Sequence, residues 1–157
     1  MTDNELFTLI FGILDAGLVA RLPDVTIVTQ QADQPTQQGT PSGPVVLVFK
    51  IGDRRSGYLQ ESDIWDVPNN KMVHTERQYM ETTFQLSVLF PQNPTVLSLT
   101  ASDLVNTCAS ILQTSAVRTQ LSALGMGMLR ITDVRNPYFT DDKDRFEANP
   151  SFDFVEL

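Results

Sequence analysis

Residues 78–90 read QYMETTFQLSVLF, and this stretch decides the fold class. One set of alternate positions is mostly apolar: Met80, Thr82, Phe84, Leu86, Val88 and Phe90. The positions between them are mostly polar. Because successive side chains of a strand point to opposite faces, this period of two predicts a strand with one buried and one wet face. Pro91 and Pro94 follow and end the strand.

Helices are predicted on both sides of this strand. Thr2 and Glu5 form a capping-box pattern that starts a helix, which Pro23 ends. Its apolar residues spread beyond one face, so it either covers a sheet and contacts a neighbour, or is a two-sided core helix. Thr100 with Asp103 predicts a second helix. Ser115 caps a third, shorter helix that ends near Gly125.

Shorter extended segments complete the pattern. We expect strands around residues 25–27, 45–51, 127–134 and 151–157, with Gly52 and Asp53 forming a hairpin turn before residues 58–59. This order predicts an α+β fold: a mostly antiparallel sheet flanked by an N-terminal helix and two consecutive helices. Residues 1–157 are expected to form a single domain. Residues 30–43 predict a long flexible loop or arm, either functional or disordered.

Composition excludes several functional classes. The net charge of −8 argues against a protein that grips nucleic acid, because such binding needs Lys and Arg on the phosphates. The net charge is −5 for residues 1–70, +1 for residues 71–132 and −4 for residues 133–157. The excess of acidic side chains therefore lies in the first and last segments. One Cys and one His rule out a disulfide and a zinc or haem ligand set, and no cofactor is expected. No signal peptide or membrane span is recognised, which fits synthesis in a reducing cytoplasm.

The residues needed for catalysis are not found together. His74 lies in a polar stretch with no nucleophile motif beside it, and Cys108 falls on the inner stripe of the second helix. Phosphate-binding and hydrolase signatures are missing. The acidic run after residue 140 resembles a calcium loop, yet Phe146 and Phe152 replace the required Gly and Glu. We therefore expect neither an enzyme nor a metal site.

Two groups are candidate protein-contact residues. Arg54 and Arg55 are expected at the hairpin tip, either as a solvated turn or as a contact to an acidic partner. The second group is a loop in which aromatic residues stand among charges: Tyr138, Phe139, Asp141, Asp142, Asp144, Arg145 and Phe146. Its aromatic residues either pin the loop onto the domain or anchor a protein interface.

Three segments resemble the neck (tail) terminator proteins of tailed bacteriophages. They read METTFQLS (80–87), LTASDLV (99–105) and VRNPYFTDDKDRFE (134–147), the last running into NPSFDF (149–154). The final block is the most specific, and the likeness covers about residues 79–156.

The resemblance implies a virion structural protein without enzymatic activity, assembled in the host cytoplasm. Members of this family form a ring, usually of about six subunits, that caps the tail tube and joins it to the head-side connector. The implied partners are the chain itself, the connector, the tail tube and, as a further option, the sheath. DNA passes through the channel without specific binding, and an acidic lining would keep it from sticking.

Two other functions stay open at this point. The first is a transient head- or tail-completion factor that leaves before the particle matures. The second is a hydrolase that uses His74.

Overall fold

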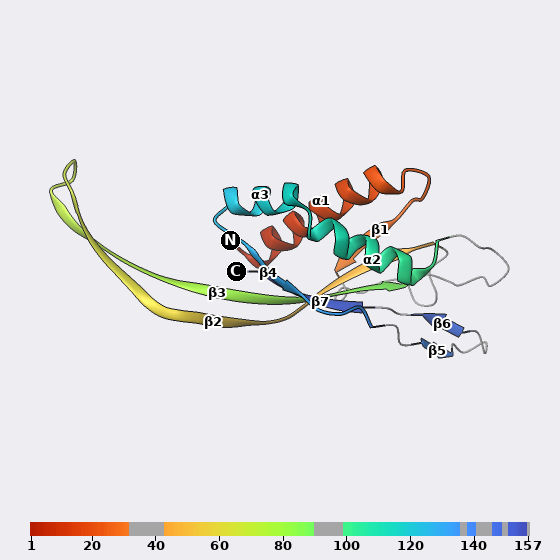
Figure 1. The fold of residues 1–157 in the computed structure, drawn as a ribbon. Coiled ribbons are helices and arrows are strands. Elements are labelled where there is room, and N and C mark those ends of the chain that lie inside the picture. The colour runs from red at the N-terminus through yellow and green to blue at the C-terminus, as the bar shows by residue number, and fades with distance from the viewer. Residues whose placement is uncertain (32–42, 90–98, 136–137, 141–145, 149–150, 157) are drawn as a thin grey trace.

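The computed structural model describes residues 1–31, 43–89, 99–135, 138–140, 146–148 and 151–156. Three helices lie on one face of a five-stranded sheet, from which a long two-stranded ribbon extends (Figure 1). The helices are α1 (Asp3–Arg21), α2 (Ala101–Leu112) and α3 (Ser115–Ala123). The sheet strands are β1 (Val28–Gln31), β2 (Val45–Asp66), β3 (Lys71–Leu89), β4 (Met128–Ile131) and β7 (Ser151–Glu156). The predicted α+β class is confirmed.

The first two helices begin where the capping residues predict, and the third begins one residue away from its expected cap. At α1, the Glu5 N–H donates to Thr2 Oγ1 at 3.3 Å and the Thr2 N–H donates to Glu5 Oε2 at 2.6 Å. Thr100 and Asp103 form the same reciprocal pair at α2. For α3 the cap is Thr114, one residue before the expected Ser115, because its hydroxyl accepts from the Val117 N–H. After α3, Gly125 has a φ of +73°, a left-handed conformation that glycine adopts without strain.

The sheet has the order β1-β2-β3-β7-β4, and only β1 and β2 are parallel. β1 begins at Val28 and extends to Gln31, so the strand expected around residues 25–27 lies later and takes two residues from the expected loop. The reason is the pairing with β2, which aligns Val28 with Val45. Residues 32–42 of that loop lie outside the described residues. β7, the predicted closing strand, pairs with both β3 and β4.

The core lies between the helices and β2 and β3. Ile10 and Leu14 of α1 are fully buried, as are Phe84 and Leu86 of β3. Thus the buried face predicted for residues 78–90 is confirmed over Thr82, Phe84, Leu86 and Val88. It does not reach Met80, which is 49 % exposed. From α2, Leu104, Val105, Cys108, Ile111 and Leu112 complete the core as predicted.

The largest difference from the sequence prediction is the length of the β2–β3 hairpin. Its turn lies at Val67–Asn70, closed by Asn70 N–H donating to the Val67 carbonyl at 3.3 Å, and not at Gly52 and Asp53. Pro68 takes the second turn position, where its fixed φ is favoured. The expected turn residues lie inside β2 instead, next to a register shift between Lys50 and Gly52. A bulge therefore stands where a turn was predicted.

A second, two-stranded sheet pairs β5 (Tyr138–Thr140) with β6 (Phe146–Ala148). The backbone places Tyr138 opposite Ala148 and Thr140 opposite Phe146. The predicted aromatic loop therefore contains a small hairpin. Its intervening residues 141–145 lie outside the described residues.

Candidate interaction surface

A prominent feature of this chain is the part of the β2–β3 hairpin that leaves the body, residues 53–81, which we call the arm. From Asp53 to Asp66, one strand of the arm reaches roughly 40 Å at about 3.3 Å per residue. It curves away from the body and ends far from the helices (Figure 1). Almost all of its side chains are exposed. An isolated two-stranded ribbon is at best marginally stable in water, so we expect the arm to bind a partner.

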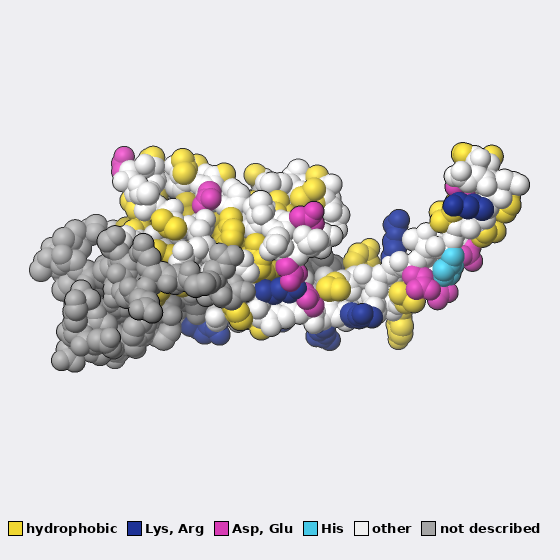
Figure 2. All heavy atoms as spheres, turned by 180° about the vertical axis from the view of Figure 1, so that it is seen from behind, with side chains coloured by type: hydrophobic (Ala, Val, Ile, Leu, Met, Phe, Trp, Pro, Cys, Tyr) yellow, Lys and Arg dark blue, Asp and Glu magenta, His cyan; other side chains and the backbone are white. Residues whose placement is uncertain are grey.

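Large apolar side chains lie exposed along this arm (Figure 2). The most exposed is Tyr58, at 94 %, and the arm also carries the only tryptophan, Trp65. The other members are Leu59, Ile64, Val67, Met72, Val73, Tyr79 and Met80. An apolar surface of this kind on a soluble protein usually marks a binding interface.

A bulge shapes the arm near Tyr58. Ser56 pairs with Tyr79 and Gln60 pairs with Arg77, so Gly57, Tyr58 and Leu59 stand opposite Gln78 alone. The φ of Gly57 is +76°, and its carbonyl accepts from Gln78 Nε2 at 3.2 Å. Bulges of this kind bend a ribbon and redirect a side chain, which explains why Tyr58 stands out from the surface.

Beyond the bulge the arm has two chemically different faces. Cross-strand pairs place Glu61 opposite Glu76, Asp63 opposite His74, and Trp65 opposite Met72 on one face, which we call the acidic arm face. The other face carries Gln60 with Arg77, Ser62 with Thr75, and Ile64 with Val73. One face therefore joins three carboxylates to an apolar pair near the tip.

His74 belongs to the acidic arm face. Its Nδ1 lies 2.5 Å from Asp63 Oδ1, and its Nε2 lies 3.2 Å from Glu76 Oε1. Hydrogen bonding to Asp63 raises the pKa of His74, and hydrogen bonding to Glu76 raises it further by a smaller amount. The predicted surface position of His74 is confirmed. Both ring nitrogens are engaged by carboxylates, an arrangement that holds a charged imidazole in place.

An ion-pair cluster fixes the arm to the body. Lys50 Nζ lies 2.7 Å from Asp3 Oδ1 at the start of α1 and 2.6 Å from Asp53 Oδ2. The Thr82 hydroxyl donates to Asp53 Oδ1 at 2.8 Å. Hydrogen bonds from Lys50 and Thr82 lower the pKa of Asp53. The root of the arm is thus held to both α1 and β3.

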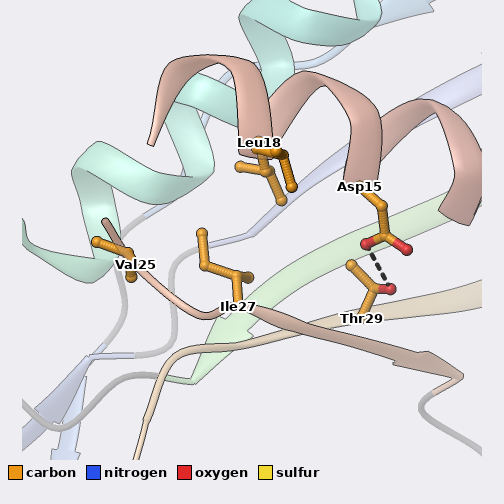
Figure 3. A pocket seen from close by; sticks show the side chains of 6 residues that line it. Asp15, Leu18, Val25, Ile27 and Thr29 are labelled. Atoms are coloured by element: carbon orange, nitrogen blue, oxygen red, sulfur yellow. Dashed lines mark hydrogen bonds between the residues drawn. The ribbon is translucent and has the colours of Figure 1, made fainter. Parts of the chain in front are cut away.

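The described part of the body includes two hollows that bear on the argument. The first, which we call the α1–β1 hollow, has a volume of about 210 Å³ and is lined by Asp15, Leu18, Val19, Val25, Ile27 and Thr29. Thr29 donates to Asp15 at 2.9 Å across its edge (Figure 3). The second, the α2–β4 hollow, has a volume of about 370 Å³ and is lined by Leu112, Gln113, Arg118, Met128, Arg130 and Ile131. The first hollow contains a carboxylate and the second contains two guanidinium groups.

The predicted contact residues have different outcomes. Arg54 and Arg55 are not at a hairpin tip: they pair with Glu81 and Met80 within the arm, and as neighbours on one strand they point to opposite faces. Tyr138, Phe139 and Phe146 belong to the β5–β6 hairpin by backbone. Asp141, Asp142, Asp144 and Arg145 lie outside the described residues. The role of these residues as contacts stays a prediction.

In the described part of the chain, Cys108 is not a reactive thiol and no metal-ligand cluster is found. Burial raises the pKa of the Cys108 thiol to about 12, so it is protonated and unreactive at neutral pH. Among the residues that the structure describes, no three His, Cys, Asp or Glu side chains are grouped to hold a metal ion. Within the same residues, no helix has the length and apolar character needed to cross a membrane.

The exposed apolar residues of the arm were not predicted from the sequence. Their signal is the turn chemistry of Pro68-Asn69-Asn70, midway between two extended segments. Because both faces of the arm are exposed, residues 53–80 lack the apolar alternation that reveals a half-buried strand.

A body of helices packed on a sheet, with a protruding arm that exposes large apolar side chains, is the architecture expected of a protein that contacts other proteins. The family model of the E217 gateway protein gp29 matches residues 5–155. The chain belongs to this family of phage gateway proteins, and the expected kinship with phage neck proteins is confirmed at this level. Its role is therefore structural and lies in the phage head–tail region. No curated protein matches the chain.

Proposed function

We propose that the chain is a virion structural protein that forms a ring at the phage neck. The ring caps the tail tube, joins it to the head-side connector and leaves a channel for DNA. The proposal includes no catalytic step and no cofactor. Family membership supports the location, and the resemblance to terminator proteins supports the capping role.

The arm is the observation that carries this proposal. A ring closes when one surface of a subunit binds a different surface of the next and the rotation returns to the start. An arm roughly 40 Å long supplies a surface far from its own body, which is what such a head-to-tail contact needs. About six subunits are expected, with Arg54, Arg55 and the Tyr138–Phe146 segment as further contacts to neighbours or adjacent rings.

The acidic composition fits a channel protein. Duplex DNA carries about one charge per 1.7 Å, so a net charge of −8 per subunit disfavours sticking as DNA passes. We propose that some of the Asp and Glu side chains responsible for this charge face the channel.

Electron micrographs of particles assembled without the chain test the function. Overlong tails, or full heads separate from tails, are the expected result. Joined particles with tails of normal length would contradict the proposal.

The copy number in purified particles tests the ring and the main alternative. About six copies per particle support a ring that stays in the virion. A chain that is required for joining but missing from mature particles would instead be a transient completion factor.

A further inference from the structure

Trp65 and Met72 form an apolar pair that the chain itself does not cover. They stand directly opposite each other near the tip of the arm, and Trp65 is 51 % exposed and Met72 59 % exposed. Tryptophan is the residue type most enriched among the energetically dominant contacts of protein interfaces. A Trp–Met pair at the end of a projecting ribbon has the form of an anchor for a pocket.

The charges beside this pair indicate the chemistry of that pocket. Glu61 and Glu76 are directly opposed across the two strands, and Asp63 lies between them and Trp65. Like charges directly opposed across a ribbon destabilise it. His74 neutralises part of this charge, and a cationic partner surface would neutralise the rest. The expected pocket is therefore apolar at its centre and basic at its rim.

The α2–β4 hollow has this composition. Leu112, Met128 and Ile131 supply apolar lining, and Arg118 and Arg130 are exposed beside them. Neither arginine forms an ion pair with any carboxylate side chain that the structure describes. The α1–β1 hollow would repel the same arm face because it contains Asp15. Charge therefore favours the α2–β4 hollow over the α1–β1 hollow.

We propose that the acidic arm face of one copy docks into the α2–β4 hollow of a second copy of this chain. Trp65 and Met72 enter the hollow, while Glu61, Asp63 and Glu76 meet Arg118 and Arg130. A second copy is needed because the arm carries its tip away from its own body (Figure 1). The contact joins two different surfaces, which is the kind of contact whose repetition generates a ring when the rotation closes. This inference rests on the proposed ring and names the surfaces that build it.

Charge reversal tests the contact in assembling particles. Cells infected by a phage lacking this gene would be supplied with one of two variants: Glu61→Arg with Glu76→Arg, or Arg118→Glu with Arg130→Glu. Each alone should lower the yield of joined particles at least about hundredfold, because both sides of the contact then carry the same sign. Supplied together they should restore most of the yield, since each reversed arm meets a reversed hollow in an alternating ring.

A matched control places positive charge on the other arm face, as Gln60→Arg with Ser62→Arg. This variant should assemble as the wild type does, and all variants should be soluble with wild-type helix content. The proposal is overturned if either reversed pair assembles normally alone, or if the two together fail to restore joining.

A direct readout follows from a photoreactive benzoylphenylalanine in place of Trp65. In joined particles it should crosslink to peptides containing Arg118 or residues 126–131 of a second copy. Crosslinks only to a different protein, or to another region of the chain, would overturn the docking proposal and leave the ring function standing. Normal particles assembled without the chain would refute the ring function itself.

Discussion

Gly17 of α1 packs closely against Ile111 of α2. A Cβ at this position would lie 2.5 Å from Ile111 Cγ2, a contact too short for two carbon atoms, and Ile111 is itself buried. Gly12 lies about one and a half turns earlier on α1, and a Cβ added there would have no neighbouring atom within 4 Å. The two glycines of one helix are thus a matched pair.

Alanine at these glycines should change stability in opposite directions. Gly12→Ala should raise the free energy of unfolding by about 0.5–1 kcal/mol, because alanine favours the helix. Gly17→Ala should lower it by about 1–2 kcal/mol, because overpacking against Ile111 outweighs the same gain. Urea denaturation followed by circular dichroism measures both. Equal stabilisation by the two changes would show that α2 yields to the new methyl group.

His74 should titrate above the ordinary range for histidine. Its carboxylate partners favour the protonated ring and raise its pKa in the folded state. Their contribution to the stability of the folded arm is therefore fully present below the pKa of His74 in the unfolded chain, and it is lost as the pH rises through the folded-state pKa. Proton NMR can follow the titration without ambiguity because His74 is the only histidine. Asp63→Asn with Glu76→Gln should bring the pKa back towards its usual value; an unchanged midpoint would argue against the two hydrogen bonds.

Residue-scale features were the most predictable from sequence. The caps at Thr2 and Thr100 depend on side chains three residues apart, so local chemistry determines them. The burial of Cys108 followed from helical spacing alone. The close approach at Gly17 could not be predicted, because it depends on how two helices distant in sequence cross.

At the scale of elements, the arm should be separable from the body. Replacing Gly57–Gln78 by Asn-Gly would close a short hairpin between Ser56 and Tyr79, a turn that suits a two-residue loop. No described side chain in the removed segment is buried, so the free energy of unfolding should change by less than about 2 kcal/mol. Joining of heads and tails should nevertheless be lost.

The control for this deletion is Leu104→Ala in the buried face of α2. It should cost about 2–5 kcal/mol, because it opens a cavity in the core. Thermal unfolding compares the two variants. A shortened-arm chain that unfolds like Leu104→Ala would show that the arm supports the body.

The β5–β6 hairpin offers a second element to test. Tyr138→Ala with Phe139→Ala should impair head–tail joining with a modest effect on folding if these aromatic side chains anchor an interface. Particle counts by electron microscopy and the yield of soluble chain separate the two roles. Loss of soluble chain would instead favour a role in pinning the segment to the domain.

The strand pattern was predictable only where one face is buried. Residues 82–88 alternate because helices cover one side of β3, whereas the arm has water on both sides and no alternation to detect. Without that alternation, the sequence predicts the turn at Gly52, the first glycine after the strand of residues 45–51. The structure has a bulge there. A glycine after a strand pattern is typical of both a turn and a bulge, so the sequence alone does not distinguish them.

For the whole molecule, the charge predicts weak contact with nucleic acid. A chain with a net charge of −8 should not retain duplex DNA at physiological salt. Gel-shift titration of the wild-type chain measures this, with a strongly basic DNA-binding protein as the positive control. A shift at micromolar concentrations of chain would contradict a channel through which DNA slides freely.

The candidate surface as a whole lay beyond sequence reasoning. The α2–β4 hollow combines residues from α2, α3 and β4, and the acidic arm face combines β2 with β3. Such sets come together only through tertiary arrangement and strand register. Of the predicted contact residues, Arg54 and Arg55 lie on the arm, but closer to its root than the apolar pair near its tip.

The position of β7 has a consequence for the order of events during synthesis. β7 follows every other described element in the chain, yet it lies between β3 and β4 and is the strand with which β4 pairs among the described residues. On the ribosome, α1 and the β2–β3 hairpin can form early, while β4 waits for residues 151–156 to emerge. A nascent chain thus displays its arm before the strand carrying Met128, Arg130 and Ile131 has been set in place. Neighbouring nascent chains on one messenger RNA would then lack a finished receiving surface, which delays their association until translation has passed β7.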